Sequence, residues 1–243
     1  MAIEDELFIE QIEIGPMHNF VYVVGSRSTR EAAIVDPAWD IDGLLEHLEK
    51  QDLKPVAALV THYHPDHCGG SMRGHQIPGV AELIAKRDLR VYAHRMEARG
   101  LKRVTGLADN DIVKVDSGDK IRIGAIEVEF LHTPGHTPGS QCFRIKNTLV
   151  SGDTLFIEGC GRVDLPGSNP DEMYESLKRL AALPDDTVLL PGHNYSAAPR
   201  ATLGETKSIN GYLKVPDLAT WQRAMGSGAV PDPRDRGEDE APR

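Results

Sequence analysis

Short apolar runs separated by polar turns dominate the first third of the chain. They stand at Phe8–Ile14, Phe20–Val24 and Ala32–Val35. Runs of this length, broken by glycine, proline and polar residues, predict β-strands. Asp40 then precedes isoleucine and leucine residues at helical spacing, which predicts a capped helix ending at Lys50.

The apolar run Pro55–Val60 predicts a central strand that is buried on both faces. Further strands are expected at Val91–Ala93, Lys120–Ile123, Ile126–Leu131, Gln141–Ile145, Thr148–Ser151 and Thr187–Leu190. Helices are expected at Val80–Lys86, near Arg95–Val104, from the Asn169 cap to a point before Pro184, and at Ala201–Leu213. Strands and helices that alternate in two halves predict the α/β class, with two sheets packed as a sandwich and flanked by helices.

The end of the chain has a different composition. Residues 226–243 are rich in Gly, Pro and charge and have almost nothing to bury. We therefore expect a disordered acidic tail there. The folded body is expected to end near Trp221, within a single domain spanning residues 1–225.

Charge and cysteine content narrow the function. The chain has 27 Lys and Arg against 37 Asp and Glu, for a net charge of −10. An acidic surface repels phosphate backbones and anionic lipids, so we expect neither a nucleic-acid nor a membrane partner. The acidic N-terminus lacks the basic region of a secretory signal, and three widely spaced cysteines form no disulfide framework. These features predict a reduced, cytoplasmic protein.

Histidines and aspartates gather at the ends of predicted strands. Five histidines and two aspartates follow four different strands: His62, His64, Asp66, His67, His136, Asp153 and His193. Strand ends are where a rigid scaffold presents functional groups. Imidazole and carboxylate ligands without a thiolate suit zinc, iron or manganese. Seven ligands exceed the needs of one tetrahedral zinc and predict two divalent ions, zinc being the first choice.

The ligands divide into two sets about one shared carboxylate. On this interpretation one ion is held by His62, His64 and His136, and the other by Asp66, His67 and His193. Asp153 bridges the two ions. Two divalent ions add a local charge of +4, so the site is expected to attract small anionic substrates despite the acidic surface.

Four segments resemble the signature motifs of the metallo-β-lactamase superfamily: THYHPDHCGG, TPGHTPGS, SGDTLF and PGHNY. The resemblance covers residues from about 18 to 213 and implies an αββα sandwich. Within the superfamily, the segments NFVY, AAIVDP and GDTLFIEGCGR are similar to those of glyoxalase II and of persulfide dioxygenases. Persulfide dioxygenases use one iron, held at the positions that match His62, His136 and Asp153.

The chain also departs from glyoxalase II. Only 243 − 195 = 48 residues follow Tyr195, where glyoxalase II continues into a helical domain that contacts glutathione. Arg162, Val163 and Asp164 stand where glyoxalase II places a lysine and an aromatic residue. Residues 69–89 are an insertion relative to both relatives, within a long stretch between His67 and His136. The segment GCGRVD is more similar to persulfide dioxygenases.

These features together predict a metal-dependent hydrolase of a small thioester or ester, similar to hydroxyacylglutathione hydrolase. Asp66 is expected to orient the attacking hydroxide and to pass its proton to the leaving group. Tyr195 and Arg162 are the candidate substrate-binding residues, although Arg162 could equally pair with Asp164. The alternative is a persulfide dioxygenase with one iron; a lactonase or a β-lactamase is a weaker alternative. A homodimer is compatible with the sequence.

The remaining histidines and cysteines have two interpretations each. His18 and His75 could line the site or lie on the surface, and His132 could support the loop that carries His136. His94 is expected to be exposed. Cys68 and Cys160 are expected to fill small buried spaces rather than to act chemically.

Overall fold

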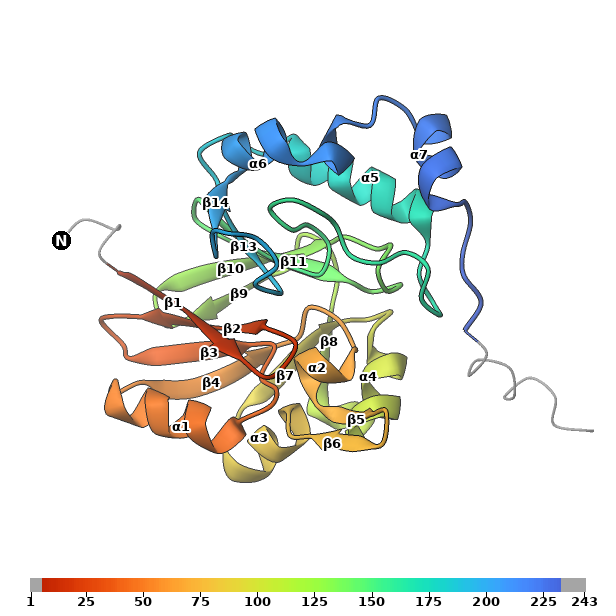
Figure 1. Ribbon diagram of the computed structural model, residues 1–243. Helices are drawn as coiled ribbons and strands as arrows, with labels where there is room; N and C mark the ends of the chain where they lie inside the picture. The colour runs from red at the N-terminus through yellow and green to blue at the C-terminus, as the bar shows by residue number, and fades with distance from the viewer. Residues whose placement is uncertain (1–5, 233–243) are drawn as a thin grey trace, which may run out of the picture.

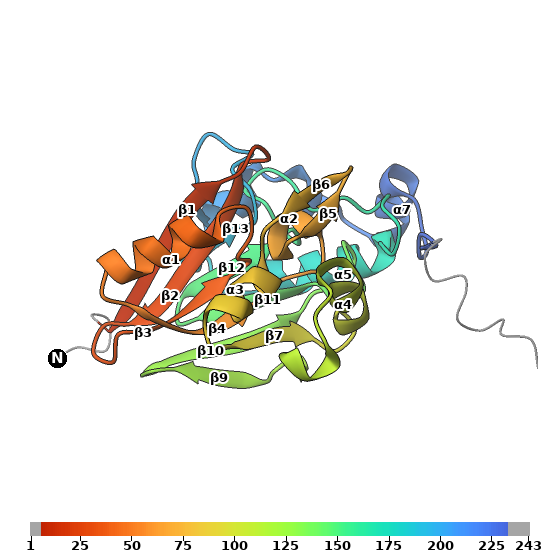
Figure 2. The same cartoon turned by 90° about the horizontal axis from the view of Figure 1, so that it is seen from below.

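Two six-stranded sheets pack face to face in a computed structural model that describes residues 6–232. Helices cover the outer face of each sheet, so the layers run helix, sheet, sheet, helix (Figure 1). The view from below shows the same order of strands in the first sheet, with its helices lying over it (Figure 2). The predicted αββα sandwich is therefore confirmed.

The first sheet contains the N-terminal half of the chain. Its strands, in spatial order, are β1 (Leu7–Ile14), β2 (Asn19–Ser26), β3 (Glu31–Val35), β4 (Lys54–Leu59), β7 (Arg90–His94) and β8 (Ile112–Val115). The β1–β2–β3 strands form an antiparallel meander, whereas β3, β4, β7 and β8 are parallel neighbours. Parallel neighbours need crossovers, which is why helices lie between these strands in the chain.

The second sheet contains the C-terminal half. Its spatial order is β14 (Ala201–Thr202), β13 (Val188–Pro191), β12 (Thr148–Gly152), β11 (Gln141–Ile145), β10 (Ile126–His132) and β9 (Lys120–Ile123). Neighbours are antiparallel except for β12 and β13, which are parallel. The crossover between these two parallel strands contains the helix α5 (Pro170–Ala181).

Seven α-helices surround the sheets within residues 6–232. They are α1 (Ile41–Lys50), α2 (Pro65–Cys68), α3 (Val80–Lys86), α4 (Ala98–Thr105), α5, α6 (Leu203–Ile209) and α7 (Leu218–Met225), with 3-10 turns at Asp109–Asp111 and Gly211–Lys214. The caps follow the sequence: the Asp40 side chain accepts from the Gly43 amide at the start of α1. The Asn169 side chain likewise accepts from the Asp171 and Glu172 amides at the start of α5.

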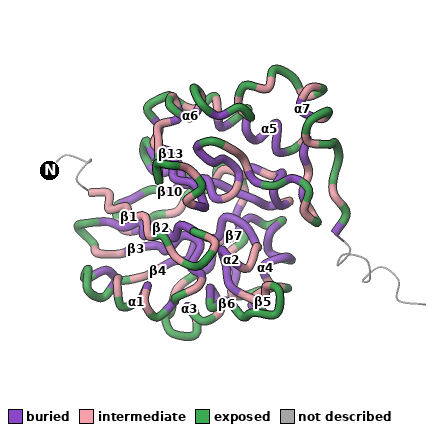
Figure 3. Tube along the Cα trace, viewed as in Figure 1, coloured by how far each residue is buried: buried purple, intermediate pink, exposed green. Residues whose placement is uncertain are grey.

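Alternation along β2 divides the core. All eight residues of β2 are buried, and its side chains point alternately to the two faces of the sheet. Phe20, Tyr22 and Val24 pack between the two sheets, whereas Val21 and Val23 pack against the helices of the first half. A third cluster lies between the second sheet and α5 to α7. Figure 3 shows the buried segments running through the sheets and the exposed ones around them.

Several sequence expectations differ from the structure. The expected strand Pro55–Val60 is fully buried only toward its end, because Lys54, Pro55 and Val56 lie at its partly exposed start. The expected helix Ala201–Leu213 is instead the short strand β14, the helix α6 and a 3-10 turn. The expected helix near Arg95 begins only at Ala98. The structure also contains elements that the sequence pattern did not predict: α2, β8, α7 and the two-stranded sheet of β5 (Gly70–Met72) and β6 (His75–Ile77).

The chain continues to pack beyond Trp221. Helix α7 extends to Met225, and Val230 exchanges two backbone hydrogen bonds with Gly167 and Ser168. The Asp232 carboxylate lies 3.1 Å from the Arg103 guanidinium and is nearly inaccessible. The expected disorder therefore does not begin at Gly226, because these polar residues find partners on the body. The rest of the predicted tail, residues 233–243, lies outside the described residues.

None of the helices in residues 6–232 combines the length and the apolar character that a membrane span requires.

Candidate metal centre

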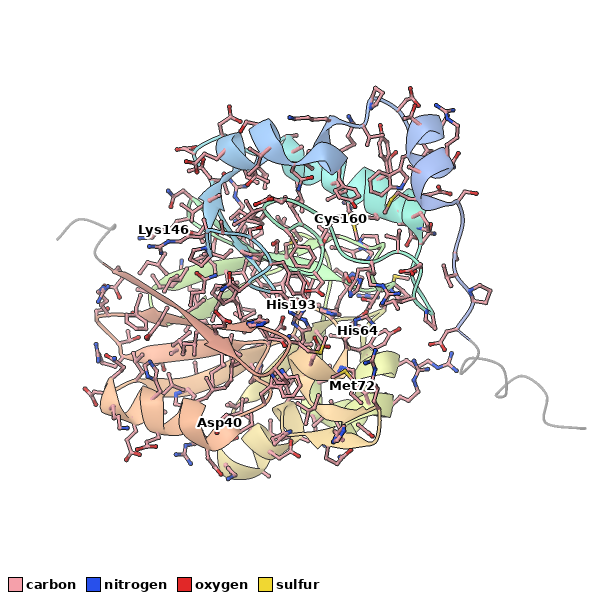
Figure 4. The ribbon with its side chains drawn as sticks, in the orientation of Figure 1. Asp40, His64, Met72, Lys146, Cys160 and His193 are labelled. Atoms are coloured by element: carbon pink, nitrogen blue, oxygen red, sulfur yellow. The ribbon has the colours of Figure 1, made fainter. Side chains whose placement is uncertain are left out.

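The predicted ligands meet at one end of the sandwich, where strands of both sheets terminate. The segment between β4 and the end of α2 supplies four of them: His62, His64, Asp66 and His67. The loops after β10, β12 and β13 supply the other three: His136, Asp153 and His193. In the view of Figure 4, His64 and His193 both lie between the two halves of the molecule. The structure thus brings together all seven predicted side chains from four separate segments.

The first set of side chains consists of His62, His64 and His136. One ring nitrogen from each lies within 4.8 Å of the others, which is a spacing that can hold one metal ion. His64 Nδ1 and His136 Nε2 are 2.9 Å apart. An Asp153 oxygen, Oδ2, lies 3.7 Å from His136 Nε2. Three imidazoles and one carboxylate therefore face a common point.

The second set consists of Asp66, His67 and His193, whose ligand atoms also lie within 4.8 Å of one another. His67 Nε2 and His193 Nε2 are 3.0 Å apart. Asp153 lies beside this set too, with Oδ1 3.4 Å from His67 Nε2 and Oδ2 3.3 Å from His193 Nε2. Asp153 thus has carboxylate oxygens near both sets, at the position where the sequence predicts a bridging ligand.

Hydrogen bonds to Nδ1 fix which nitrogen of the histidines in the second set can bind a metal. His67 Nδ1 lies 3.0 Å from Asp36 Oδ2, and His193 Nδ1 lies 2.9 Å from the carbonyl of Met17. Both oxygens are acceptors, so each Nδ1 carries a proton and each Nε2 faces the cluster, where it can bind a metal ion.

The same arrangement holds for two histidines of the first set. His136 Nδ1 donates to the Arg162 carbonyl at 2.8 Å. His62 Nδ1 lies 2.9 Å from the Thr61 hydroxyl, whose own proton goes to Asp36. His62 Nδ1 is therefore the donor, and its Nε2 points inward. His64 differs, because its Nδ1 is the nitrogen that faces the cluster.

Two buried polar atoms in the cluster have no hydrogen-bond partner among the described residues, namely His62 Nε2 and Asp153 Oδ1. Buried polar atoms normally have a partner. A nitrogen lone pair and a carboxylate oxygen aimed at the same space fit a divalent cation rather than a proton donor. The residues present therefore fit a bound divalent metal on the geometry alone.

The electrostatics of the cluster also favour added positive charge. Burial lowers the pKa of His62, and burial together with His136 lowers the pKa of His64 to about 3. Both rings therefore stay neutral, as metal ligands must be. At His67, burial is outweighed by Asp153 and Asp66, which raise its pKa to about 10. The two carboxylates thus favour positive charge at this point of the cluster, carried by a second proton on the His67 ring or by a metal ion in its place.

Asp36 positions a histidine of each set through hydrogen bonds: His67 directly, and His62 through Thr61. Its Oδ1 accepts from the Thr61 amide at 2.7 Å, and its Oδ2 accepts from the Thr61 hydroxyl at 2.6 Å and from His67 Nδ1. A grouping of Asp36 with His62 and His67 has metal-like spacing as well. Both Asp36 oxygens nevertheless accept hydrogen bonds already, from Thr61 and from Nδ1 of His67, the ring nitrogen opposite the one that faces the cluster. We therefore assign Asp36 to positioning; the sequence reading missed it, although it directly follows β3.

Glu97 joins the two loops that carry the first set. It precedes α4, and its carboxylate accepts from the Tyr63 amide at 2.8 Å, the Thr137 hydroxyl at 2.6 Å and the Gly139 amide at 2.8 Å. Burial raises its pKa to about 7 against these hydrogen bonds. Tyr63 lies between His62 and His64, and Thr137 follows His136. Sequence reasoning missed Glu97, because nothing local to it indicates these distant partners.

Two glycines give the backbone the space that the cluster needs. A Cβ on Gly192 would lie 2.3 Å from Asp153 Oδ1. Gly152 has a φ of +49°, and a Cβ there would lie 2.7 Å from the Thr61 side chain. Both positions therefore require glycine, because a residue without a Cβ lets the backbone approach the ligands.

The cluster opens into a cavity of about 640 Å³. Metal-cluster residues form its floor, and its walls come from four other segments; the wall residues include Met17, Met72, Arg73, Phe156, Glu158, Cys160, Arg162, Leu165 and Tyr195. Cavities of this size suit small molecules. In Figure 4, Met72 and Cys160 lie on opposite sides of His64.

The two predicted substrate-binding residues both line this cavity. The Tyr195 ring stacks on His193 with centroids 4.6 Å apart and is 58% exposed. Arg162 forms a two-point contact with Asp164, at 2.9 Å and 2.8 Å. The expected alternative for Arg162, pairing with Asp164, is therefore the one the structure shows.

The other candidates fall outside the cluster. His18 contacts Glu13 at 2.6 Å on the surface, and His75 is exposed on β6. His94 is buried, which corrects the expectation of an exposed side chain. Its ring stacks on His132 at 3.8 Å, and His132 Nε2 lies 2.9 Å from the Pro138 carbonyl, in the loop that carries His136. Cys68 is fully buried, as expected.

Comparisons with known proteins agree with this geometry. The sequence profile of the metallo-beta-lactamase superfamily matches residues 14–193. A hydroxyacylglutathione hydrolase of Rhodopseudomonas palustris (strain BisB5) is 40% identical over 217 residues, which covers 88% of this chain and 77% of the relative. The crystal structure of ETHE1 from Myxococcus xanthus superposes with a TM-score of 0.76 at 26% identity, covering 90% and 89% of the two chains.

A second similar structure contains metal. TTHA1623, solved in a di-iron-bound form, is 32% identical, has a TM-score of 0.68, and covers 84% of this chain and 99% of its own. The chain therefore belongs to the metallo-β-lactamase superfamily. Its similarity to a hydroxyacylglutathione hydrolase and to ETHE1 is consistent with the glyoxalase II and ETHE1 branch of that superfamily. The superfamily is one of enzymes that bind divalent metals.

Proposed function

We propose that this chain is a metal-dependent hydrolase of a small thioester or ester. One observation carries the proposal: two complete sets of three ligands lie side by side, with Asp153 bordering both. Two such sets beside one shared carboxylate can hold two ions, whereas a site for one ion needs only one of the sets. The 40% identity to a hydroxyacylglutathione hydrolase supports the choice of substrate class.

On this proposal His62, His64 and His136 hold one ion, and Asp66, His67 and His193 hold the other. Asp153 bridges them. Nitrogen and oxygen ligands suit zinc, iron or manganese, and we propose zinc as the first choice. Two such ions, when bound, lower the pKa of a water molecule to about 7 and polarise the carbonyl of the substrate.

Asp66 is placed to orient the nucleophile and to move a proton. The Asn19 amide donates to Asp66 Oδ2 at 3.0 Å, and the Trp39 indole donates to both the Asn19 Oδ1 and the Asp66 carbonyl. These contacts fix the carboxylate, and its Oδ1, which has no hydrogen bond from residues 6–232, can accept a proton and deliver it to the leaving group. His67 and His193 lower the pKa of Asp66 against the effect of burial, so it is ionised at neutral pH.

A thioester suits this arrangement because a thiolate is a good leaving group that needs little protonation. The apolar walls from Met17, Met72, Phe156 and Leu165 can exclude water from the substrate. The exposed edge of Tyr195 places a hydroxyl at the cavity mouth, where it can donate to the substrate. Burial raises the pKa of Tyr195 to about 12, which keeps that proton in place.

A second candidate is a persulfide dioxygenase. The similarity in structure to ETHE1 favours it, as does the presence of His62, His136 and Asp153 around the first set. Two histidines and one carboxylate are the ligand set of many non-haem iron oxygenases. This reaction leaves Asp66, His67 and His193 without a metal-binding role, although the hydrogen bonds to Nδ1 of the two histidines leave each Nε2 facing the cluster.

Substitution of the second set separates the two candidates. We expect His193→Ala, purified with added zinc, to lose hydrolysis of S-lactoylglutathione and of acetyl thioesters. The same variant, loaded with iron, should show no oxygen uptake on glutathione persulfide. Unchanged thioester hydrolysis in His193→Ala would refute the two-ion proposal. Oxygen uptake by the iron-loaded wild type that survives His193→Ala would establish the dioxygenase instead.

A further inference from the structure

A short β-hairpin overhangs the metal cavity. Its strands β5 and β6 pair from Gly70 and Ile77 to Met72 and His75. The hairpin lies within residues 69–89, which the resemblance to glyoxalase II and persulfide dioxygenases predicts to be an insertion. Arg73 and Gly74 form the two-residue turn, with φ values of +51° and +83°. Such values at both central positions match the tight turns of β-hairpins. Met72 and Arg73 line the cavity.

The base of the hairpin is held rigidly. A Cβ on Gly69 would lie 2.6 Å from the Gly79 backbone, and a Cβ on Gly70 would lie 2.2 Å from the Val104 carbonyl. The backbone therefore packs closely against α4 and against the segment before α3. Because β5 follows α2 almost directly, the hairpin has a defined position relative to the ligands Asp66 and His67. The tip, by contrast, is exposed.

Arg73 has a left-handed backbone conformation, which is unfavourable for arginine. Left-handed φ values favour glycine or asparagine, and other residues cost free energy there. The side chain gains nothing in return within the protein, because Arg73 has no hydrogen bond or ion pair among residues 6–232. The other arginine of the cavity, Arg162, is neutralised by Asp164. Arg73 is thus the unpaired cation of the cavity wall within the described part of the chain.

We propose that Arg73 binds a carboxylate of the substrate, so that the natural substrate is a thioester or ester carrying a free carboxylate. This inference rests on the proposed hydrolase function and names its substrate class. An arginine guanidinium pairs with a carboxylate through two parallel hydrogen bonds, which fixes orientation as well as affinity. The reacting carbonyl lies over the metal cluster, while the carboxylate reaches the hairpin tip.

Glu158 contributes to the orientation of the substrate in the cavity. This residue is exposed on the loop that carries Cys160 and lines the same cavity. That loop and the hairpin stand on opposite sides of His64 (Figure 4). Glu158 repels a carboxylate from its side of the cavity, whereas Arg73 attracts it to the other. The two charges therefore select one orientation of an anionic substrate.

Two pairs of thioesters test the proposal, since the carboxylate can stand on the acyl part or on the thiol part. The first pair is S-succinyl-N-acetylcysteamine and its neutral amide, S-succinamoyl-N-acetylcysteamine. The second pair is S-acetyl-3-mercaptopropionate and S-acetyl-3-mercaptopropionamide. The measured quantity is the ratio of kcat/KM for the acid to that for the amide, in zinc-loaded wild type, Arg73→Gln and Arg73→Glu.

We expect the wild type to prefer the acid in at least one pair by about tenfold, as for one well-formed charged contact. In Arg73→Gln the ratio should fall to about 1, and in Arg73→Glu to below 1. High salt should lower the wild-type ratio, because the pair is open to solvent. Arg122→Gln is the matched control, because Arg122 is an exposed arginine on the edge strand β9 and its loss changes the net charge equally. The control should keep the wild-type ratio.

A wild-type ratio near 1 in both pairs, or a preference that survives in Arg73→Gln, would overturn the proposal. If no thioester is hydrolysed, the proposed function fails. The role of Arg73 is then tested separately, by measuring the binding of stable analogues. The probes are then the stable thioethers S-(3-carboxypropyl)-N-acetylcysteamine and 3-(ethylthio)propanoate, compared with their amides by calorimetry. Tighter binding of either acid that disappears in Arg73→Gln would support the role, and equal binding in both pairs would refute it.

Discussion

The substitution Asp36→Asn tests whether the contacts behind the ligands prepare the site for metal. Asp36 has a φ of +51°, which asparagine tolerates well. The change therefore leaves the backbone alone and alters one atom, since the amide nitrogen replaces Oδ2. That oxygen accepts from the Thr61 hydroxyl at 2.6 Å and from His67 Nδ1 at 3.0 Å. An amide N–H cannot accept either proton.

The loss of the oxygen that faces His67 Nδ1 changes the position of the ring proton. With an N–H facing it, His67 Nδ1 must become the acceptor, and the proton moves to Nε2, where it blocks metal binding. Removal of a supporting contact of this kind costs about 10- to 100-fold in metal affinity, or about 1.4–2.7 kcal/mol. The Oδ1 bond to the Thr61 amide remains, so the fold should be retained.

Competition with a coloured chelator measures the effect as the affinity for each of two zinc ions. We expect Asp36→Asn to weaken the ion held by His67 and His193, with a wild-type circular dichroism spectrum. Asp109→Asn is the control, because it makes the same chemical change at an exposed carboxylate that contacts Lys102 and Lys114. Two ions bound with wild-type affinity in Asp36→Asn would refute the reasoning about the ring proton.

Three further predictions concern stability. Burial raises the folded-state pKa of Glu97 from 4.5 to about 7, so its contribution to the free energy of unfolding is greatest below pH 4.5 and falls by about 3 kcal/mol as the pH rises to 7. Denaturant unfolding of the metal-free protein should show this fall relative to Glu97→Gln, and parallel pH profiles would contradict it. A chain ending at Ser227 should unfold at a lower temperature than one ending at Asp232, because it loses the two Val230 backbone bonds and the Asp232–Arg103 contact; equal melting temperatures would show that these contacts contribute nothing. Metal removal by a chelator should lower the melting temperature of the wild type, because bound ions stabilise the folded state, whereas Asp153→Ala should respond much less; an unresponsive wild type would argue against resident metal.

Local signals account for most of the fold that could be predicted from the sequence. The apolar run of β2, the alternation along β10, and the caps of α1 and α5 are properties of neighbouring residues. The helix α7 and the segment to Asp232 could not be predicted in this way, because tertiary contacts hold them. The Trp221 indole is fully buried and donates to the Pro170 carbonyl, 51 residues away.

The candidate ligands could be predicted because each follows the end of a strand. The same rule points to Asp36, which follows β3, but its role as a support becomes visible only when Thr61 and His67 are seen beside it. The burial of His94 could not be predicted locally, because the ring that stacks on it, His132, lies on the other sheet. The hairpin tipped by Arg73 has strands of only three residues, too short for a periodic pattern.

The most direct test of the central claim is a metal titration of the metal-free wild type, followed by thioester hydrolysis. Zinc is added in fractions of an equivalent per chain, and the rate with an acetyl thioester is recorded at each step. The two-ion site predicts that the rate rises to its plateau at two equivalents, with little activity restored by the first. A plateau at one equivalent, or no hydrolysis with any divalent metal while one iron per chain supports oxygen uptake on a persulfide, would contradict it.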